Sequence, residues 1–240
     1  MIRIIKVKDY EEASDKAFEV MKEFIAPGKV LGLATGSTPL GLYARMVKDH
    51  KENGTSYKDI RSFNLDEYVG LEITHPESYY AFMHRNLFDQ IDIPEENTHV
   101  PSGLGDDLEG QAKKYDEMID ASPVDIQLLG IGSDGHIAFN EPGTPFDSGT
   151  HVTDLAESTI RDNCRFFDND MSKVPTQAVT QGIGTIMKAK NILLIATGAN
   201  KAQAVKDMIS GPIDVSCPAS ILQKHDNVTV IVDEAAASLL

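Results

Sequence analysis

The sequence predicts a single α/β domain with a mostly parallel sheet and helices on both of its faces. Four apolar runs have the length and composition of buried strands: residues 29–34, 125–132, 191–197 and 227–232. Apolar residues at helical spacing occur in two stretches, residues 13–25 and 201–209. Because alternating strands and helices form parallel sheets, we expect ligands to bind at the carboxyl ends of these strands.

The remaining segments fit the same domain. Residues 1–7 resemble a further strand, which charged residues interrupt before a signal-peptide core could form. Residues 99–107 and 140–149 are rich in Gly, Pro, Ser and Asp and predict loops. No apolar run approaches the length of a membrane helix, about 20 residues. A chain of 240 residues is therefore expected to fold as one domain, residues 1–240.

Composition and charge narrow the classes of partner. Hydrophobic residues make up 41% and charged residues 25%, as in ordinary globular proteins. The 22 basic and 37 acidic residues give a net charge of −15, which disfavours nucleic acid and anionic membranes as partners. An anionic ligand must then be held by a few local donors. With two cysteines, no disulfide scaffold is expected, and a cytoplasmic location fits.

The first segment that predicts chemistry is residues 31–43, where a buried strand runs into a turn at Gly36. Ser37 and Thr38 are suited to capping a helix, and Pro39 is suited to its first position. The backbone N–H groups at such a helix start favour an anion, so a phosphate site is one interpretation. An ordinary capped helix is the other. The segment lacks the lysine that a Walker A loop requires.

The second segment, residues 62–68, predicts a short strand that ends in the adjacent acids Asp66 and Glu67. Neighbouring side chains on a strand point to opposite faces, so only one of the two can enter a given site. A partly buried carboxylate there could act as a general base, since burial brings its pKa nearer neutrality. A helix cap or a surface charge pair is the alternative for both residues.

The third segment, residues 128–143, places Asp134, His136 and Glu141 on a glycine-rich loop after a buried strand. Histidine transfers protons readily near neutral pH, and two nearby carboxylates would hold its ring and raise its pKa. The grouping favours acid–base chemistry over a loop histidine that is merely bonded to a local aspartate.

Three other interpretations of this segment rank lower. The pattern from Gly130 to Gly135 matches a dinucleotide fingerprint, but Pro142 breaks the chain too soon for the required helix. The three titratable residues could bind a metal, yet no further histidine or paired-cysteine spacing accompanies them. A serine hydrolase elbow around Ser133 would need glycine at position 131, which is isoleucine.

Two basic residues complete the candidates. Lys201 follows a buried strand through a short turn, and Arg165 could add a forked pair of N–H donors to an anion site. Both could instead be ordinary surface cations. Cys164 is a poor candidate nucleophile because nothing in the sequence places a base beside it.

Taken together, these segments resemble the glucosamine-6-phosphate deaminase family over essentially the whole chain. The matching motifs are residues 35–39, 64–71, 75–80, 134–142, 165–170 and 198–201. The run from Asp134 to Pro142 is the specific one, since the related 6-phosphogluconolactonases share its Asp-Gly-His and then continue differently.

The resemblance implies a Rossmann-like three-layer α/β/α sandwich and an enzyme of amino sugar catabolism. Such enzymes convert glucosamine 6-phosphate and water to fructose 6-phosphate and ammonia, without a metal or cofactor. It implies that Asp66 moves a proton between C2 and C1, and that His136 opens the sugar ring. The supporting residues that it implies are Asp134 and Glu141 beside the histidine, Gly36, Ser37, Thr38, Arg165 and Lys201 at the phosphate, and a lid around residues 155–175.

The chain departs from the larger, allosteric members of that family. It stops at Leu240, and His151 and Thr153 stand where those members carry basic residues for a phosphorylated effector. The resemblance is therefore to the short, often monomeric branch. Lactone hydrolysis on a sugar phosphate and a sugar-phosphate sensor that binds without turnover are the rival functions.

Overall fold

The central sheet of this computed structural model, which describes residues 2–240, contains seven parallel strands. In spatial order they are β1 (Ile2–Val7), β10 (Val228–Asp233), β9 (Ile192–Ala196), β6 (Ile126–Leu129), β2 (Val30–Leu33), β3 (Arg61–Asn64) and β5 (Thr98–His99). The four strands predicted from apolar runs are confirmed, and so is the strand at the start of the chain. Met1, which the prediction included, lies outside the described residues.

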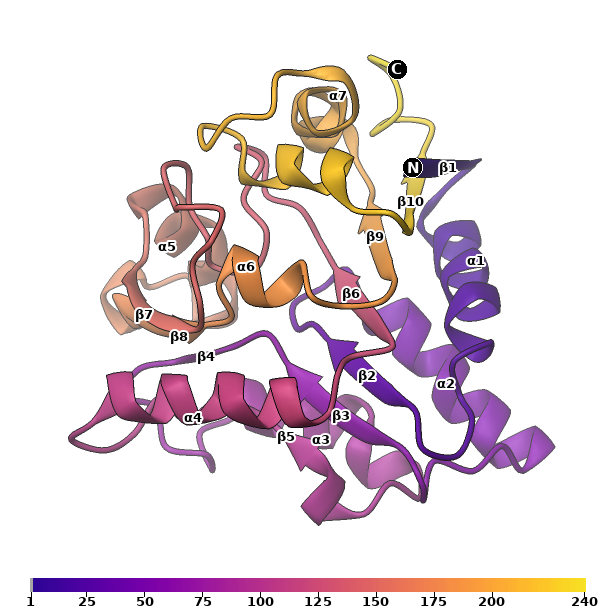
Figure 1. Cartoon of the computed structure of the whole chain (residues 1–240), viewed down its shortest axis with the longest axis vertical. Coiled ribbons are helices and arrows are strands. Elements are labelled where there is room, and N and C mark those ends of the chain that lie inside the picture. Colours follow the sequence, from indigo (N-terminus) through magenta and orange to yellow (C-terminus); the bar gives the residue numbers. More distant parts are fainter. Residues whose placement is uncertain (1) are drawn as a thin grey trace.

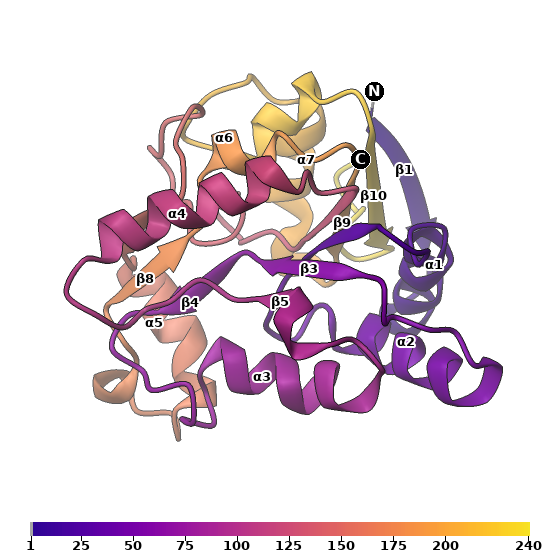
Figure 2. The ribbon, with the colours of Figure 1, turned by 60° about the horizontal axis from the view of Figure 1, so that its bottom comes forward.

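Helices cover both faces of this sheet, as predicted (Figures 1 and 2). One face carries α1 (Tyr10–Lys22), α2 (Leu40–Asn53) and α3 (Tyr79–Asn86), and the other carries α4 (Leu108–Ala121), α6 (Ile183–Ile186) and α7 (Ala202–Ser210). Short 3-10 helices span Phe88–Gln90, Glu95–Asn97, Cys164–Phe166, Met171–Lys173, Ala199–Lys201 and Pro218–Lys224. The result is the expected three-layer sandwich. Of the helices in residues 2–240, none is both long and apolar enough to cross a membrane.

Helix α1 begins and ends three residues earlier than its apolar pattern predicted. Asp9 caps it, since its side chain accepts a hydrogen bond of 3.0 Å from the backbone N–H of Glu12. Glu12 in turn accepts a hydrogen bond from the N–H of Lys8, at 2.7 Å. These reciprocal bonds resemble a capping box, and they fix the start of the helix ahead of its first buried residue, Ala13.

A second, antiparallel sheet was not predicted. It contains β4 (Asp66–Tyr68), β8 (Gln177–Thr180) and β7 (His151–Asp154), with Asp66 opposite Thr180. The prediction that the strand after residue 62 ends in the two acids is therefore wrong. Strand β3 ends at Asn64, and Asp66 begins β4.

Two apolar clusters form the interior. The larger one fills the space between the central sheet and its helices. The smaller one lies beneath residues 155–175 and contains Tyr68, Phe139, Leu155, Phe167, Val174 and Ala178. The segment predicted to be a lid, which includes α5 (Glu157–Asn163), thus rests on an apolar base of its own.

The order of the strands decides where a ligand site can form. Strands β2 and β6 are neighbours, and the chain proceeds from β2 toward β3 on one side and from β6 toward β9 on the other. Such a switch point leaves a crevice beyond the carboxyl ends of the strands. The segments that follow β9, β6, β2 and β3 meet there, and these are the segments that carry the predicted site residues.

Candidate active site

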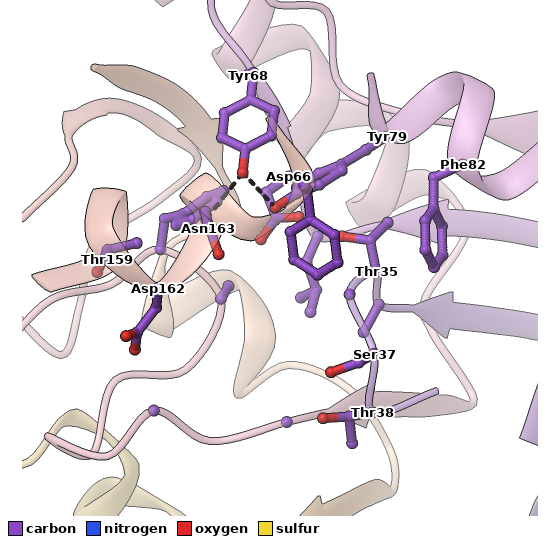
Figure 3. A pocket seen from close by; sticks show the side chains of 18 of the residues that line it. Thr35, Ser37, Thr38, Asp66, Tyr68, Tyr79, Phe82, Thr159, Asp162 and Asn163 are labelled. Atoms are coloured by element: carbon purple, nitrogen blue, oxygen red, sulfur yellow. Dashed lines mark hydrogen bonds between the residues drawn. The ribbon is translucent and has the colours of Figure 1, made fainter. Parts of the chain in front are cut away.

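One cavity of about 420 Å³ at this edge of the sheet gathers most of the predicted site residues. Those that line it are Gly36, Ser37, Thr38, Asp66, His136, Arg165 and Lys201. Asp134 and Glu141 lie behind His136, within contact distance of its ring. Figure 3 shows Ser37 and Thr38 on one side of the cavity, Thr159 and Asp162 of α5 on the other, and Asp66 in the space between.

The turn after β2 differs from its prediction in one respect. Gly36 has a φ of +86°, a conformation that only glycine adopts at little cost. The helix that follows begins at Leu40. Its N-cap residue is Pro39, not a hydroxyl residue, and Pro39 makes no side-chain capping bond within the described residues. The predicted capping by Ser37 and Thr38 is therefore wrong.

A distant tyrosine closes this turn instead. The Tyr10 hydroxyl donates to the carbonyl oxygen of Ser37 at 3.0 Å and accepts from the N–H of Gly41 at 2.8 Å. Because Tyr10 secures the backbone, the hydroxyl groups of Ser37 and Thr38 can face the cavity that they line. Together with the start of α2, they form a set of donors suited to an anion.

Two cations, Arg165 and Lys201, line the same cavity. The Arg165 guanidinium lies 4.7 Å from the centroid of the Phe166 ring, and Lys201 is the N-cap residue of α7. Burial lowers the pKa of the Lys201 ammonium, and the negative charges of Asp162 and Asp134 oppose this shift. These cations give an acidic protein a local positive site for an anionic ligand.

Asp66 is the buried carboxyl group of the cavity. Its side chain is 6% exposed, and it lies just beyond the carboxyl end of β3. Burial and, to a smaller extent, the negative charge of Glu67 raise the pKa of Asp66 to about 8, while His136 opposes the shift. A carboxylate whose pKa is that high is a stronger base than an ordinary aspartate, so it is suited to remove a proton from carbon.

Glu67, the neighbouring acid, has a structural role. Its carboxylate accepts hydrogen bonds from the backbone N–H groups of Tyr68, Tyr79 and Tyr80, at 2.8, 2.9 and 2.9 Å. Two of these donors are in the first turn of α3, where Ser78 supplies the side-chain cap. The two adjacent acids thus point to different surroundings, as alternation along a strand requires.

We predict that Glu67→Ala destabilises the protein by about 3 kcal/mol or more, because three buried or partly buried N–H groups lose a charged acceptor. Urea unfolding monitored by circular dichroism would measure this loss. Glu72→Ala is the matched control on an exposed glutamate, and its free energy of unfolding should stay within about 0.5 kcal/mol of the wild type. Equal effects of the two substitutions would contradict the structural role of Glu67.

His136 lies between two carboxylates. Its Nδ1 atom is 2.7 Å from Oδ1 of Asp134 and 3.4 Å from Oε2 of Glu141. Gly132 makes room for the ring, since a Cβ atom there would lie 2.3 Å from ring atoms of His136. With Nδ1 held by the carboxylates, the other ring nitrogen, Nε2, is the one left for a ligand in the cavity.

The charges around His136 favour its protonated form. Burial lowers the pKa of the imidazole, but Asp134 and Glu141 outweigh it and raise that pKa to about 9. In return, the hydrogen bond with His136 lowers the pKa of Asp134 to about 2. The ring is therefore a cation at neutral pH and can act as a proton donor.

The same three side chains could also be considered as metal ligands, since their ligand atoms lie within 4.8 Å of one another. The separation of 2.7 Å between His136 Nδ1 and Asp134 Oδ1 is the length of a charge-assisted hydrogen bond. The two carboxylates thus stabilise the charge of the imidazolium as ion pairs, which favours proton transfer over metal binding.

Comparison with known proteins decides the family. The model for glucosamine-6-phosphate isomerases/6-phosphogluconolactonase matches residues 10–231. The chain belongs to this family. A glucosamine-6-phosphate deaminase of Streptococcus uberis is 53% identical over the full length of both chains. One from Shouchella clausii is 52% identical and covers 99% of this chain and 97% of its own.

Solved structures of family members have the same fold. A monomeric glucosamine-6-phosphate deaminase superposes with a TM-score of 0.97 at 43% identity, and the match covers 99% of this chain and 100% of that one. A 6-phosphogluconolactonase from Trypanosoma brucei reaches 0.83 at 23% identity, covering 100% and 99%. The second likeness concerns the fold alone.

Several residues of the site were not predicted from the sequence. Thr35, Tyr79, Thr159, Asp162 and Asn163 all line the cavity. Thr35 and Tyr79 lie in residues 35–39 and 75–80, which resemble motifs of the family, so the sequence does contain a signal for them. The three residues of α5 had none, because an ordinary polar helix surface would have the same composition.

Proposed function

We propose that this chain is a glucosamine-6-phosphate deaminase, which converts glucosamine 6-phosphate and water to fructose 6-phosphate and ammonia. The observation that carries the proposal is the arrangement of three groups in one cavity. A buried carboxyl group with a raised pKa and a cationic imidazole face the same space as a set of donors for phosphate. Isomerisation of a sugar phosphate can use all three groups, as the base at C2, the acid at the ring oxygen and the binding site of the phosphate.

In this proposal the phosphate binds at residues 36–38, Arg165 and Lys201. The phosphate is remote from the reacting carbons, so its binding energy can hold C1 and C2 near Asp66 and His136. Residues 155–175 act as a lid over the bound sugar, and Arg165 links that lid to the phosphate. The apolar cluster supports this role, since Leu155, Phe167 and Val174 of the segment pack against Tyr68, Phe139 and Ala178 of the rest of the molecule.

His136 opens the ring in the first chemical step. Its Nε2 donates a proton to the ring oxygen O5 as the C1–O5 bond breaks, and then accepts the proton of the C1 hydroxyl. The imidazole regains its charge, and the product is the open-chain aldehyde. Asp134 and Glu141 stabilise the cationic ring before and after the transfer.

Asp66 then moves a proton between carbons. The C2 hydrogen is acidic once C1 is an aldehyde, so the carboxylate removes it and returns it to C1. In the same step O1 takes a proton from the cationic His136 and becomes a hydroxyl, so that C2 is left as an iminium carbon. Water adds to C2, ammonia leaves as the ketone forms, and the proton that is released returns to His136. No redox change occurs in this sequence, and one carboxylate can serve both proton transfers.

Release of ammonia from glucosamine 6-phosphate tests this function. We expect turnover of that substrate, much weaker turnover of glucosamine, which lacks the phosphate, and no hydrolysis of 6-phosphogluconolactone. Rapid lactone hydrolysis without ammonia release would support the rival enzyme. Tight binding of the sugar phosphate without turnover would support the sensor.

Truncating a cation at the phosphate end should weaken substrate binding. For Lys201→Ala and Arg165→Ala we predict an increase in KM of about tenfold or more, because each removes a charged donor. Steady-state ammonia release would measure it. Lys224→Ala, outside the cavity, is the matched control and should leave KM unchanged. An unchanged KM in both cavity variants would show that the phosphate binds elsewhere.

We also propose that the protein is a monomer and that it acts in the cytoplasm. The monomeric deaminase that is 43% identical to this chain supports the first part.

A further inference from the structure

Helix α5 makes a direct hydrogen bond to the carboxylates around His136. The Thr159 hydroxyl, in a residue that is 6% exposed, donates to Oε1 of Glu141 at 2.5 Å. The other oxygen of that carboxylate, Oε2, is 3.4 Å from Nδ1 of His136. Glu141 therefore connects the segment above the cavity with the imidazole inside it.

A second bond from the same face of α5 reaches the strand that carries Asp66. Asn163 lies one turn after Thr159, and its amide Nδ2 donates to the Tyr68 hydroxyl at 2.9 Å. Tyr68 is two residues after Asp66 in β4. Figure 3 shows Thr159 and Asn163 on α5, with Asn163 joined to Tyr68 close to Asp66. Helix α5 is thus bonded to the surroundings of both reacting groups.

We propose that Thr159 is a positioning residue that couples the seating of α5 to the charge of His136. When α5 packs as in this structure, the Thr159 hydroxyl binds Oε1 of Glu141, and Oε2 faces the imidazole. When α5 lifts, Glu141 loses this restraint and His136 keeps one close carboxylate, that of Asp134. The coupling rests on the proposed function, because Arg165, which follows α5, is there assigned to the substrate phosphate.

Two other charged groups move with α5: Asp162 on the helix and Arg165 directly after it line the same cavity as His136, and their charges are opposite. The remaining groups near His136 come from other elements. Asp134 belongs to the loop of His136 itself, and Asp66 belongs to β4. Lys201 and Cys217 lie near Asp134, and they come from the C-terminal part of the chain. Glu141 contacts both Thr159 of α5 and the ring of His136, so it is the group through which a change in α5 would reach the imidazole by direct contact.

The test is the titration of His136 by NMR in the full-length, unliganded protein, with His136→Gln used to assign its signal. In Thr159→Val, which keeps the shape of the side chain and removes the hydroxyl, we expect the midpoint to fall by about half a pH unit or more. Thr159→Ser, which keeps the hydroxyl, should titrate like the wild type. Thr229→Val on β10 is the matched control and should also be unchanged.

Kinetics provide a second readout. Thr159→Val should lower kcat about tenfold with little change in KM, and Thr159→Ser should restore kcat. A merely structural role would lower Tm and leave the titration midpoint in place. Thr159→Ala is measured in the same way if the valine variant does not fold.

An unchanged midpoint in the variants without the hydroxyl, or a midpoint in Thr159→Ser as low as in Thr159→Val, would overturn the coupling. Because the titration needs no substrate, its result is independent of the proposed function. A shifted midpoint in a protein that releases no ammonia would support the coupling and contradict the deaminase.

Discussion

Asp66→Asn is expected to lose nearly all turnover and to make the protein more stable. An amide cannot accept the C2 proton, and loss of a general base lowers rates about a thousandfold. The phosphate site is untouched, so substrate should still bind. Exchange of the C2 hydrogen with deuterium oxide, followed by NMR, isolates this step. Exchange at the wild-type rate would remove Asp66 from the role.

The gain in stability follows from the pKa of the buried carboxyl group. That pKa is about 8 in the folded protein, whereas in an unfolded chain it is about 3.9. Between these values folding takes up a proton, so this group's contribution to stability falls as the pH rises from about 4 to about 8. Asparagine has no such penalty. The Tm difference between Asp66→Asn and wild type should therefore be larger at pH 8 than at pH 5, and an equal difference at both would contradict the raised pKa.

His136→Gln is expected to slow turnover about a hundredfold or more, because ring opening loses its proton donor and acceptor. In the wild type, kcat/KM should fall on the alkaline side as the imidazole loses its proton, with a midpoint near its pKa of about 9. Glutamine does not titrate, so this alkaline limb should disappear in the variant.

A pH series of ammonia release for both proteins would measure the two effects. Stability gives an independent check, because His136→Gln should lower Tm whereas Asp66→Asn should raise it. Because the folded pKa of His136 exceeds the unfolded value of about 6.5, its contribution is complete below that pH and is lost as the pH rises through about 9. His136→Gln should therefore lower Tm at pH 6. Wild-type turnover with the alkaline limb intact would contradict the assignment.

The parts of the fold that the sequence predicts are those with a local signal. The central strands are short apolar runs, and the site residues lie in turns directly after them, so the parallel order of the strands brings the residues together. Helix α1 begins three residues before its apolar pattern because Asp9 caps it, and this cap is a local signal that the sequence also contains.

Pairings between distant segments have no such signal. Strand β4 is three residues long and pairs with residues 178–180, so neither segment marks the second sheet by itself. The capping of α2 by Tyr10 spans about 30 residues and replaces the hydroxyls that a local pattern favours. The bond from Thr159 to Glu141 likewise depends on where α5 rests, which only the folded chain decides.

A crystal structure with the open-chain alcohol of the substrate, 2-amino-2-deoxyglucitol 6-phosphate, would test the shared cavity most directly. The phosphate is predicted to lie against Ser37, Thr38, Arg165 and Lys201, with C2 about 3.5 Å from a carboxylate oxygen of Asp66. His136 should face the C1 end of the same molecule. A phosphate bound elsewhere, or a C2 atom out of reach of Asp66, would contradict a proton transfer performed by these residues.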